Sequence, residues 1–202
     1  VKNEGDFIEK TLKNLCLHFT FDYWVIADTG SMDGTQLKIQ QFFDTKNIPG
    51  ELVEHTWRDF GFNRNKALEL AFNKTDYILL WNAGEKIKGN IDIPDTIDKK
   101  MYYLKHDDKE TNYQPRLLSN RNEWRYIGIL YEYLIHLTEI SPCDKEELGG
   151  DYFIQRDAFG IRQNDIGKYE KHAQLLEKEM ETEKDDLLFS RYAFYCAQSY
   201  NN

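Results

Sequence analysis

The sequence predicts an α/β protein, in which helices flank a mostly parallel sheet and a helical hairpin follows at the C-terminus. Up to Trp81, short apolar runs alternate with amphipathic helical patterns, which is typical of right-handed βαβ units. After Asp165, two helical stripes follow without strand patterns between them. We therefore expect one domain at 1–160 and a helical extension, itself expected to be truncated, at 161–202.

The N-terminal elements follow from local patterns. Residues 6–18 form a predicted helix, because apolar side chains recur every three or four positions and Asp6 can cap the start. The aromatic and β-branched run at 23–27 predicts a buried strand, and Leu52-Val53 is the candidate second strand. The apolar face of a helix between them comprises Leu37, Ile39, Phe42 and Phe43.

The later elements are predicted in the same way. Residues 63–73 read as a third helix and 77–81 as a third, fully apolar strand, whereas 101–154 shows shorter, mixed signals of extra strands and long loops. The inner face of the third helix comprises Ala67, Leu68, Ala71 and Phe72. The stripes of the C-terminal hairpin comprise Tyr169, His172, Ala173, Leu176 and Met180, then Leu188, Tyr192, Tyr195 and Ser199.

Composition limits the function. The 202 residues include 26 Lys and Arg against 35 Asp and Glu, and a net charge of −9 disfavours binding to nucleic acid or anionic lipid. No run approaches the roughly 18 apolar residues of a membrane-spanning helix. Three widely separated cysteines, Cys16, Cys143 and Cys196, indicate neither a disulfide framework nor a zinc site. A reducing, cytoplasmic compartment fits this composition best.

Three polar clusters adjoin the predicted strands and helices, at 2–4, 28–35 and 82–85. In open α/β sheets, ligands bind beyond the carboxyl ends of the strands, near helix N-termini. If the strands are parallel, the three clusters meet at one edge of the sheet. The sequence therefore predicts a small-molecule site at this edge.

Two charged residues are candidates for ligand contacts. Asp28, at the end of its strand, could accept hydrogen bonds from a base or a ribose, or it could shape the turn and cap the next helix. Arg64, early in the third helix, could reach a phosphate or a base carbonyl, or it could be a solvated surface charge. The residues themselves leave both pairs of alternatives open.

Four ordered motifs stand out in the sequence: Lys2-Asn3-Glu4, the loop Asp28-Thr29-Gly30-Ser31-Met32-Asp33-Gly34-Thr35, the segment 57–65 with Arg64-Asn65, and Asn82-Ala83-Gly84-Glu85. Together they resemble family 2 glycosyltransferases, in the branch with KNE, DTGSTDGT, W-x-x-F-x-x-x-RN and DADE. Weaker similarity continues through 124–132, which resembles that branch's W-x-G-x-x-HE segment, into the C-terminal helices.

The resemblance implies a GT-A fold that binds a nucleotide-activated sugar, usually a uridine diphosphate (UDP) sugar, and transfers the sugar with inversion to an acceptor that the sequence does not identify. Such transfer needs a general base for the acceptor hydroxyl, and Glu132 is the candidate, with a structural Glu paired to an Arg as the alternative. The implied donor-binding residues are Asn3, Glu4, Asp28, Gly30, Ser31 and Arg64 around the nucleoside, and Asn82, Ala83, Gly84 and Glu85 beside the diphosphate.

The chain departs from the family at its metal motif. Asn82 and Gly84 stand where the branch has the two aspartates of DxD, which leaves Glu85 as a weak candidate ligand, and Tyr131 replaces the His before Glu132. Hard cations prefer several anionic oxygens, so we expect no ordinary Mn²⁺ or Mg²⁺ site and no certain cofactor.

Three outcomes stay open. The enzyme could be metal-independent, with Lys86, Lys88 or an arginine neutralising the leaving diphosphate; it could bind metal weakly through Glu85 and Asn82; or it could be an inactive relative that still binds a nucleotide. The segment His106-Asp107-Asp108 could supply replacement carboxylates or form a solvated turn.

Two other classes of protein compete with this interpretation. The segment 25–31 fits the apolar-apolar-x-DTGS signature of aspartic peptidases, which would require a homodimer that uses Asp28 from each copy. A nonenzymatic nucleotide-sugar-binding or scaffold protein is supported by the missing DxD acids. Four aromatic residues could stack on a sugar ring or fill a core: Trp124, Tyr126, Tyr131 and Tyr133.

Overall fold

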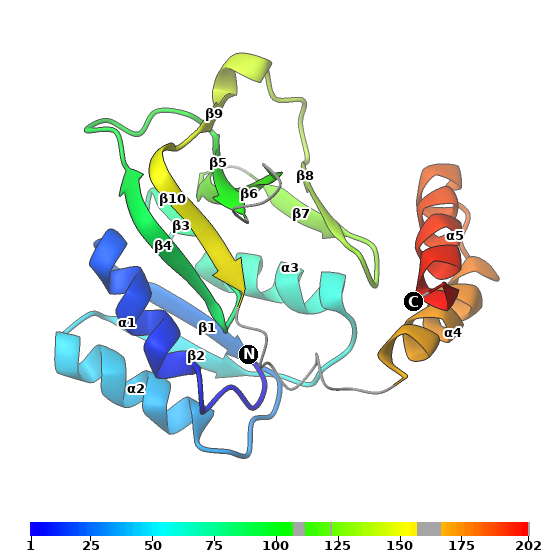
Figure 1. The fold of residues 1–202 in the computed structure, drawn as a ribbon, viewed down its shortest axis with the longest axis horizontal. Coiled ribbons are helices and arrows are strands. Elements are labelled where there is room, and N and C mark those ends of the chain that lie inside the picture. Colours follow the sequence, from blue (N-terminus) through cyan, green and yellow to red (C-terminus); the bar gives the residue numbers. More distant parts are fainter. Residues whose placement is uncertain (107–111, 122, 157–166, 202) are drawn as a thin grey trace.

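The computed structural model describes residues 1–106, 112–121, 123–156 and 167–201, which form a mixed α/β body followed by two helices (Figure 1). The helices are α1 (Ile8–His18), α2 (Thr35–Lys46), α3 (Phe60–Ala71), α4 (Lys168–Met180) and α5 (Asp186–Tyr200), with a short 3-10 helix, η1, at Pro142–Asp144. The strands are β1 (Trp24–Asp28), β2 (Gly50–Glu54), β3 (Tyr77–Leu79), β4 (Glu85–Asp92), β5 (Met101–His106), β6 (Asn112–Ser119), β7 (Trp124–Ile127), β8 (Tyr133–His136), β9 (Lys145–Glu147) and β10 (Gly149–Arg156).

The first βαβ unit forms as the sequence predicts. β1 and β2 pair in parallel, with Asp28 opposite Glu54, and α2 connects them. The aromatic rings of Trp24 and Phe43 stack with their centroids 4.4 Å apart, which ties α2 to β1. The apolar core of this unit comprises Ile8, Leu12, Trp24, Ile39, Phe42 and Phe43.

The second sheet is mixed, in the order β3-β6-β5-β10-β4 with β9 beside β5. β3 pairs antiparallel with β6, and β5–β6 and β10–β4 are also antiparallel, whereas β5 is parallel to β9 and β10. The prediction of a mostly parallel sheet is therefore wrong. Most of these strands come from 101–156, and the short connection at 107–111 permits only antiparallel pairing of β5 with β6.

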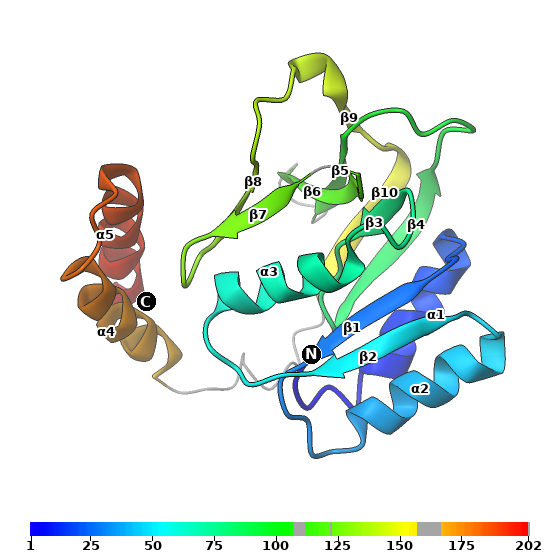
Figure 2. The same cartoon turned by 180° about the vertical axis from the view of Figure 1, so that it is seen from behind.

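An apolar cavity of about 490 Å³ lies between β1 and β3, and side chains of α1 and α3 line it as well. Across this cavity the described residues form no strand pairing. At one end of it, the N–H of Thr29 donates to the carbonyl of Val1, and the amino group of Val1 donates to the carbonyl of Ala27. α3 lies between the β1–β2 pair and β7 (Figure 2).

Capping decides where α3 begins. The carboxylate of Asp59 accepts a hydrogen bond from the N–H of Phe62 at 2.7 Å, so the helix begins at Phe60 and not at residue 63 as predicted. Its C-terminal end also differs from the prediction, because Phe72 is the C-cap and is 43% exposed. The buried stripe of α3 is therefore narrower than the predicted inner face.

The first two helices also differ in detail from the predictions. α1 begins at Ile8, and no side chain caps its N-terminus, so the expected cap by Asp6 does not form. In α2, Leu37 is 62% exposed, whereas Ile39 is fully buried. Leu37 was expected on the inner face, but it points away from the core that Ile39 shares with β1.

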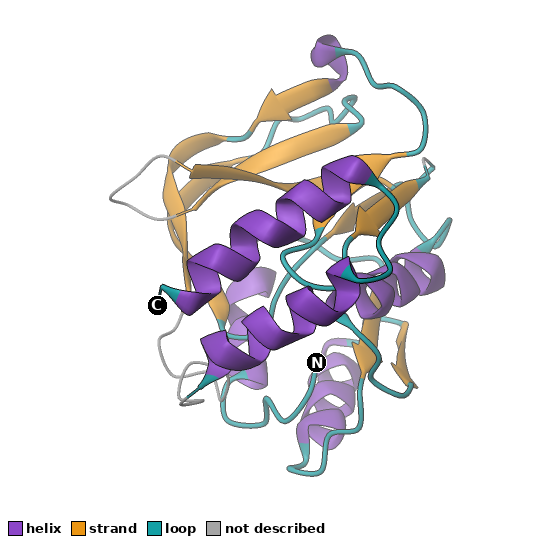
Figure 3. Ribbon diagram, turned by 90° about the vertical axis from the view of Figure 1, so that its right-hand side faces the viewer, coloured by secondary structure: helices purple, strands orange, loops and turns teal. Residues whose placement is uncertain are grey.

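The predicted C-terminal hairpin is present, with α4 and α5 side by side (Figure 3). Leu176 of α4 and Tyr192 of α5 are buried in one core with Leu130, from the turn that joins β7 to β8. Arg191 donates from Nε (3.1 Å) and Nη2 (2.8 Å) to the carbonyl of Tyr131 in the same turn. The hairpin therefore packs on the segment that carries Glu132, and none of the described helices is long and apolar enough to cross a membrane.

Candidate functional site

The loop after β1 is organised by the fully buried carboxylate of Asp28. It accepts hydrogen bonds from the N–H groups of Gly30 (2.9 Å) and Ser31 (2.8 Å), from the Ser31 hydroxyl (2.5 Å) and from the Gln36 amide (2.8 Å). Burial alone would raise the pKa of Asp28, but these hydrogen bonds outweigh burial and hold the pKa below its usual value. Asp28 therefore shapes the loop, as the turn alternative expects, but it does not cap α2, whose N-cap Gly34 has no side-chain cap. Contact of Asp28 with a base stays a prediction.

The segment Lys2-Asn3-Glu4 is hydrogen-bonded directly to this loop. The N–H of Asn3 donates to the hydroxyl of Ser31 at 2.8 Å, and its side-chain carbonyl accepts from the N–H of Met32 at 2.8 Å. The N–H of Glu4 donates to the hydroxyl of Thr35, the first residue of α2, at 2.8 Å. Two of the three predicted clusters therefore meet at the carboxyl end of β1, beside the N-terminus of α2.

The third cluster, at 82–85, lies next to the N-terminal segment. The N–H of Gly84 donates to the hydroxyl of Thr11 in α1 at 3.1 Å, and Ala83 packs against the same apolar core as Val1. The start of β4, the end of β10 and the end of β1 all lie near the N-terminus (Figure 1). The three clusters lie together, as expected from the sequence, although β3 does not pair with β1.

Glu85 is a buried carboxylate held by two arginines. Nη2 of Arg116, on β6, lies 3.1 Å from Oε1 and 3.0 Å from Oε2, and Nη2 of Arg156, at the end of β10, lies 3.1 Å from Oε1. The side-chain amide of Asn82 donates to Oε1 at 2.9 Å. Burial would raise the pKa of Glu85, but Arg116, Asn82 and Arg156 lower it below its usual value. Glu85 is therefore an ionised internal counter-ion.

Arg116 extends the network to His106. Its Nε donates to Nε2 of His106 at 3.1 Å, and its Nη1 donates to the carbonyl of Leu80 at 3.3 Å. Burial and the charge of Arg116 lower the pKa of His106 to about 4, so the imidazole is neutral at physiological pH and accepts this bond. The other two members of the predicted segment, Asp107 and Asp108, lie outside the described residues.

Arg64 joins Glu132 to the 82–85 cluster. Its Nε pairs with Oε1 of Glu132, and its Nη2 donates to the side-chain carbonyl of Asn82 at 3.2 Å. The guanidinium lies 5.2 Å from the ring centroid of Tyr126. Burial acts to lower the pKa of Arg64, but Tyr126 and Glu132 raise it above its usual value. The candidate base is thus paired with an arginine, in the same network as the residues expected beside the diphosphate.

These residues do not fit a divalent metal held at the DxD position. Asn82 offers an amide, Gly84 has no side chain, and both oxygens of Glu85 face guanidinium groups. Hard cations are held by several anionic oxygens, and two fixed positive charges oppose a third. Within the described ranges, no group of three or more His, Cys, Asp or Glu side chains is arranged to hold a metal ion.

Arg116 and Arg156 were not among the residues predicted for the site. Both lie on strands far along the chain from Glu85, and only the register of β10 on β4 places Arg156 opposite it. The lysines proposed for the leaving group, Lys86 and Lys88, alternate with the buried residues of β4, so Lys86 lies on the face opposite to Glu85. The one general rule that could have indicated a cation near Glu85 is that a buried carboxylate requires a cationic partner.

Three of the four aromatic residues considered for sugar stacking pack against other side chains of the protein. Trp124 is 8% exposed, and the ring of Tyr131 stacks on Tyr195 of α5 with centroids 4.2 Å apart. Tyr133 lies under the guanidinium of Arg191, 4.8 Å from its ring centroid. These contacts favour the core-filling alternative for these rings.

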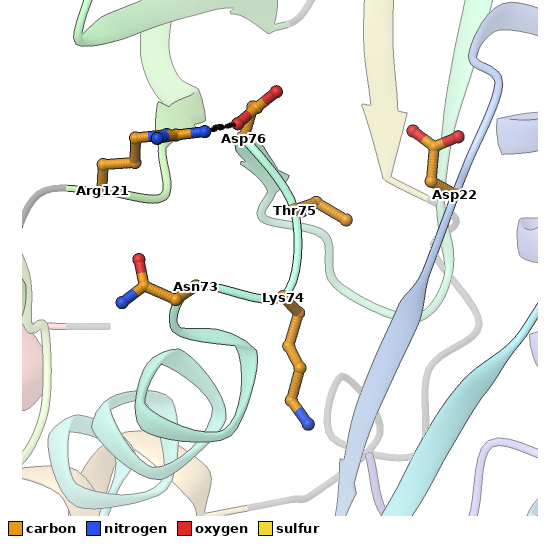
Figure 4. A pocket seen from close by; sticks show the side chains of 6 residues that line it. All are labelled: Asp22, Asn73, Lys74, Thr75, Asp76 and Arg121. Atoms are coloured by element: carbon orange, nitrogen blue, oxygen red, sulfur yellow. Dashed lines mark hydrogen bonds and ion pairs between the residues drawn. The ribbon is translucent and has the colours of Figure 1, made fainter.

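A polar cavity of about 560 Å³ lies away from this site (Figure 4). Asp22 precedes β1 and Asp76 precedes β3, which places the cavity at the amino ends of these strands. Arg121 there is paired with Asp76. The cavity is lined by Asp22, Asn73, Lys74, Thr75, Asp76 and Arg121.

The comparison with protein families supports the resemblance at the level of the family. Residues 1–136 match the model described as "Glycosyl transferase family 2", which is more than half of the chain. The chain therefore belongs to glycosyltransferase family 2, and its mixed α/β body is consistent with a GT-A-like fold. Comparisons with curated proteins and with solved structures found no match.

The family assignment contradicts the aspartic peptidase alternative, because the DTGS segment lies inside the matched region. β1, which leads into that segment, belongs to a parallel pair. A peptidase of that class needs two aspartates that share a proton, whereas the carboxylate of Asp28 is fully buried and bonded within its own loop.

Proposed function

We propose that this chain is an inverting glycosyltransferase that moves a sugar from a UDP-sugar to a hydroxyl acceptor without a divalent metal. Family membership supports a nucleotide-sugar donor and an acceptor in general. The single observation that carries the proposal is the hydrogen-bonded contact between the loop at 28–35 and the segment at 2–4, with the 82–85 cluster beside them. In this arrangement, one edge of the protein could contact both the nucleoside and its phosphates.

In this proposal the nucleoside binds against 2–4 and 28–35. Gly30 has φ +90° and faces open space, because a Cβ there would meet no atom within 4 Å. A ligand can therefore approach the main chain of the loop closely. Asn3 and Ser31 hold the two segments together, so the binding surface is formed before the nucleotide arrives.

The proposed reaction uses Glu132 as the base. Its Oε1 is paired with Arg64, which leaves Oε2 to take the proton of the acceptor hydroxyl. The acceptor oxygen then forms a bond to the anomeric carbon as the bond from that carbon to the diphosphate oxygen breaks. The electron pair goes to the diphosphate, which leaves as UDP, and attack from the opposite side inverts the anomeric centre.

Calorimetric titration of UDP, with and without Mn²⁺, tests the proposal. We expect UDP to bind and Mn²⁺ to leave its affinity unchanged. Binding that Mn²⁺ enhances would show that metal independence is wrong, and absence of UDP binding under both conditions would remove the proposal as a whole.

A second candidate function is nucleotide-sugar binding without transfer, which the pairing of Glu132 with Arg64 and the missing DxD acids favour. UDP release from a panel of UDP-sugars separates the two candidates. Release by the wild type that Glu132→Gln abolishes, with UDP affinity retained, supports the transferase. UDP-sugar binding without release in either protein supports the second candidate.

A further inference from the structure

The end of β10 places an exposed arginine beside the 82–85 cluster. Arg156 pairs with Glu85 in the antiparallel register of β10 and β4, and residues directly opposite each other in such a register share one face of the sheet. Its Nη2 lies 3.1 Å from Oε1 of Glu85, while 62% of its side chain is exposed. Arg156 therefore contacts the buried network through Nη2, while most of its side chain is exposed to solvent.

The charge of Arg156 exceeds what Glu85 requires. Arg116 alone contacts both oxygens of Glu85, and the two side chains are 6% and 1% exposed. The network around them contains three guanidinium groups, from Arg64, Arg116 and Arg156, and two carboxylates, from Glu85 and Glu132. With His106 neutral, this network of five charged side chains carries one surplus positive charge, in a chain whose net charge is −9.

A surplus guanidinium at this place suits a diphosphate. Departure of UDP places negative charge on phosphate oxygens, and a fixed positive charge stabilises it. Guanidinium presents five N–H donors in a planar fork that matches phosphate oxygens. Among the described residues Glu85 is the partner of Arg156. That contact uses Nη2, so Nη1 and Nε remain as donors for a ligand.

We propose that Arg156 binds the diphosphate of the donor in the position where a divalent metal would otherwise act, with Glu85 and Arg116 as positioning residues. This inference rests on the proposed function. The contacts of Glu85 support this inference. Its ion pairs with Arg116 and Arg156 make Glu85 unsuitable as a metal ligand, and the same pairing holds Arg156 in place. Lys86 is a weaker candidate, since it lies on the other face of β4.

The test compares the binding of UDP with that of uridine, which lacks the phosphates. We expect Arg156→Gln to weaken UDP binding about 10- to 100-fold, the range for loss of a charge-assisted hydrogen bond, and to leave uridine binding unchanged. Arg156→Lys should lie between, because an ammonium keeps the charge without the planar fork. Arg121→Gln is the matched control, since Arg121 is 75% exposed and also paired with one acid, at the other end of the strands. It should leave both affinities unchanged.

The outcomes distinguish this inference from the proposed function. If the wild type binds UDP and Arg156→Gln binds it equally well, Arg156 does not bind the diphosphate, and the proposed function stands. If Arg156→Gln weakens UDP and uridine equally, its role is structural and the inference is overturned. If the wild type binds neither ligand, the proposed function itself fails. Circular dichroism checks that the variant folds, which we expect because Arg116 still neutralises Glu85.

Discussion

The neutral imidazole of His106 makes the stability of this protein depend on pH. His106 is 8% exposed and accepts a hydrogen bond from Arg116, and its pKa falls from an ordinary 6.5 to about 4. The folded state therefore binds a proton less readily than the unfolded state. This contribution to stability is fully present above about pH 6.5 and is lost as the pH falls toward 4. At about 1.4 kcal/mol for each pKa unit, the total loss is about 3 kcal/mol.

His106→Gln isolates this contribution, because a glutamine side chain keeps an acceptor for Arg116 but does not titrate. Urea unfolding of both proteins, followed by tryptophan fluorescence at several pH values, gives the free energy of unfolding. The difference between the two proteins near pH 8 serves as the baseline. As the pH falls to 4, we expect the wild type to lose about 3 kcal/mol more of its free energy of unfolding than the variant does. A difference that stays constant across this range would refute the neutral, buried imidazole.

Two further predictions concern local backbone structure. Asp59→Ala should destabilise the protein by about 1 kcal/mol because it removes the cap of α3, whereas Asp59→Asn, which keeps an acceptor, should retain most of the stability in the same unfolding assay. Gly84→Ala should lower the free energy of unfolding by about 1 kcal/mol. The cause is backbone strain alone, since Gly84 has φ +80° and a Cβ there would meet no atom within 4 Å. Gly149→Ala is the control, because no positive φ is required there, and thermal unfolding should show almost no change.

Local patterns were sufficient for the first part of the fold and for the gathering of its polar loops. The alternation of apolar strands and helical stripes identified α1, β1, α2, β2 and α3, because each element buries its own apolar residues. The boundaries depended on caps, and a single hydrogen bond to Asp59 moved the start of α3. Such a bond is determined by side-chain geometry, which periodicity does not contain.

The second sheet was not predictable from the same patterns. Several of its pairs join strands that are far apart in the chain, such as β10 with β4 and β6 with β3, so no local signal sets their register. The consequence for the site is specific. Arg156 meets Glu85 only through the register of β10 on β4, and Arg116 meets it from β6. Sequence motifs located the carboxylate, but they could not reveal that two arginines already hold it.

The two arginines around Glu85 are expected to have different roles, Arg116 in stability and Arg156 in diphosphate binding. A buried carboxylate without a cation would strongly destabilise the protein, so Glu85 requires a partner whether or not a ligand is present. Arg116, itself 6% exposed, meets that demand, and this pairing permits Arg156 to remain 62% exposed without leaving Glu85 uncompensated. Loss of Arg116 should therefore reduce stability first, whereas loss of Arg156 should reduce diphosphate binding first. A carboxylate that appears as the remnant of a metal motif in the sequence thus acts, in the folded chain, as the anchor of a positive charge.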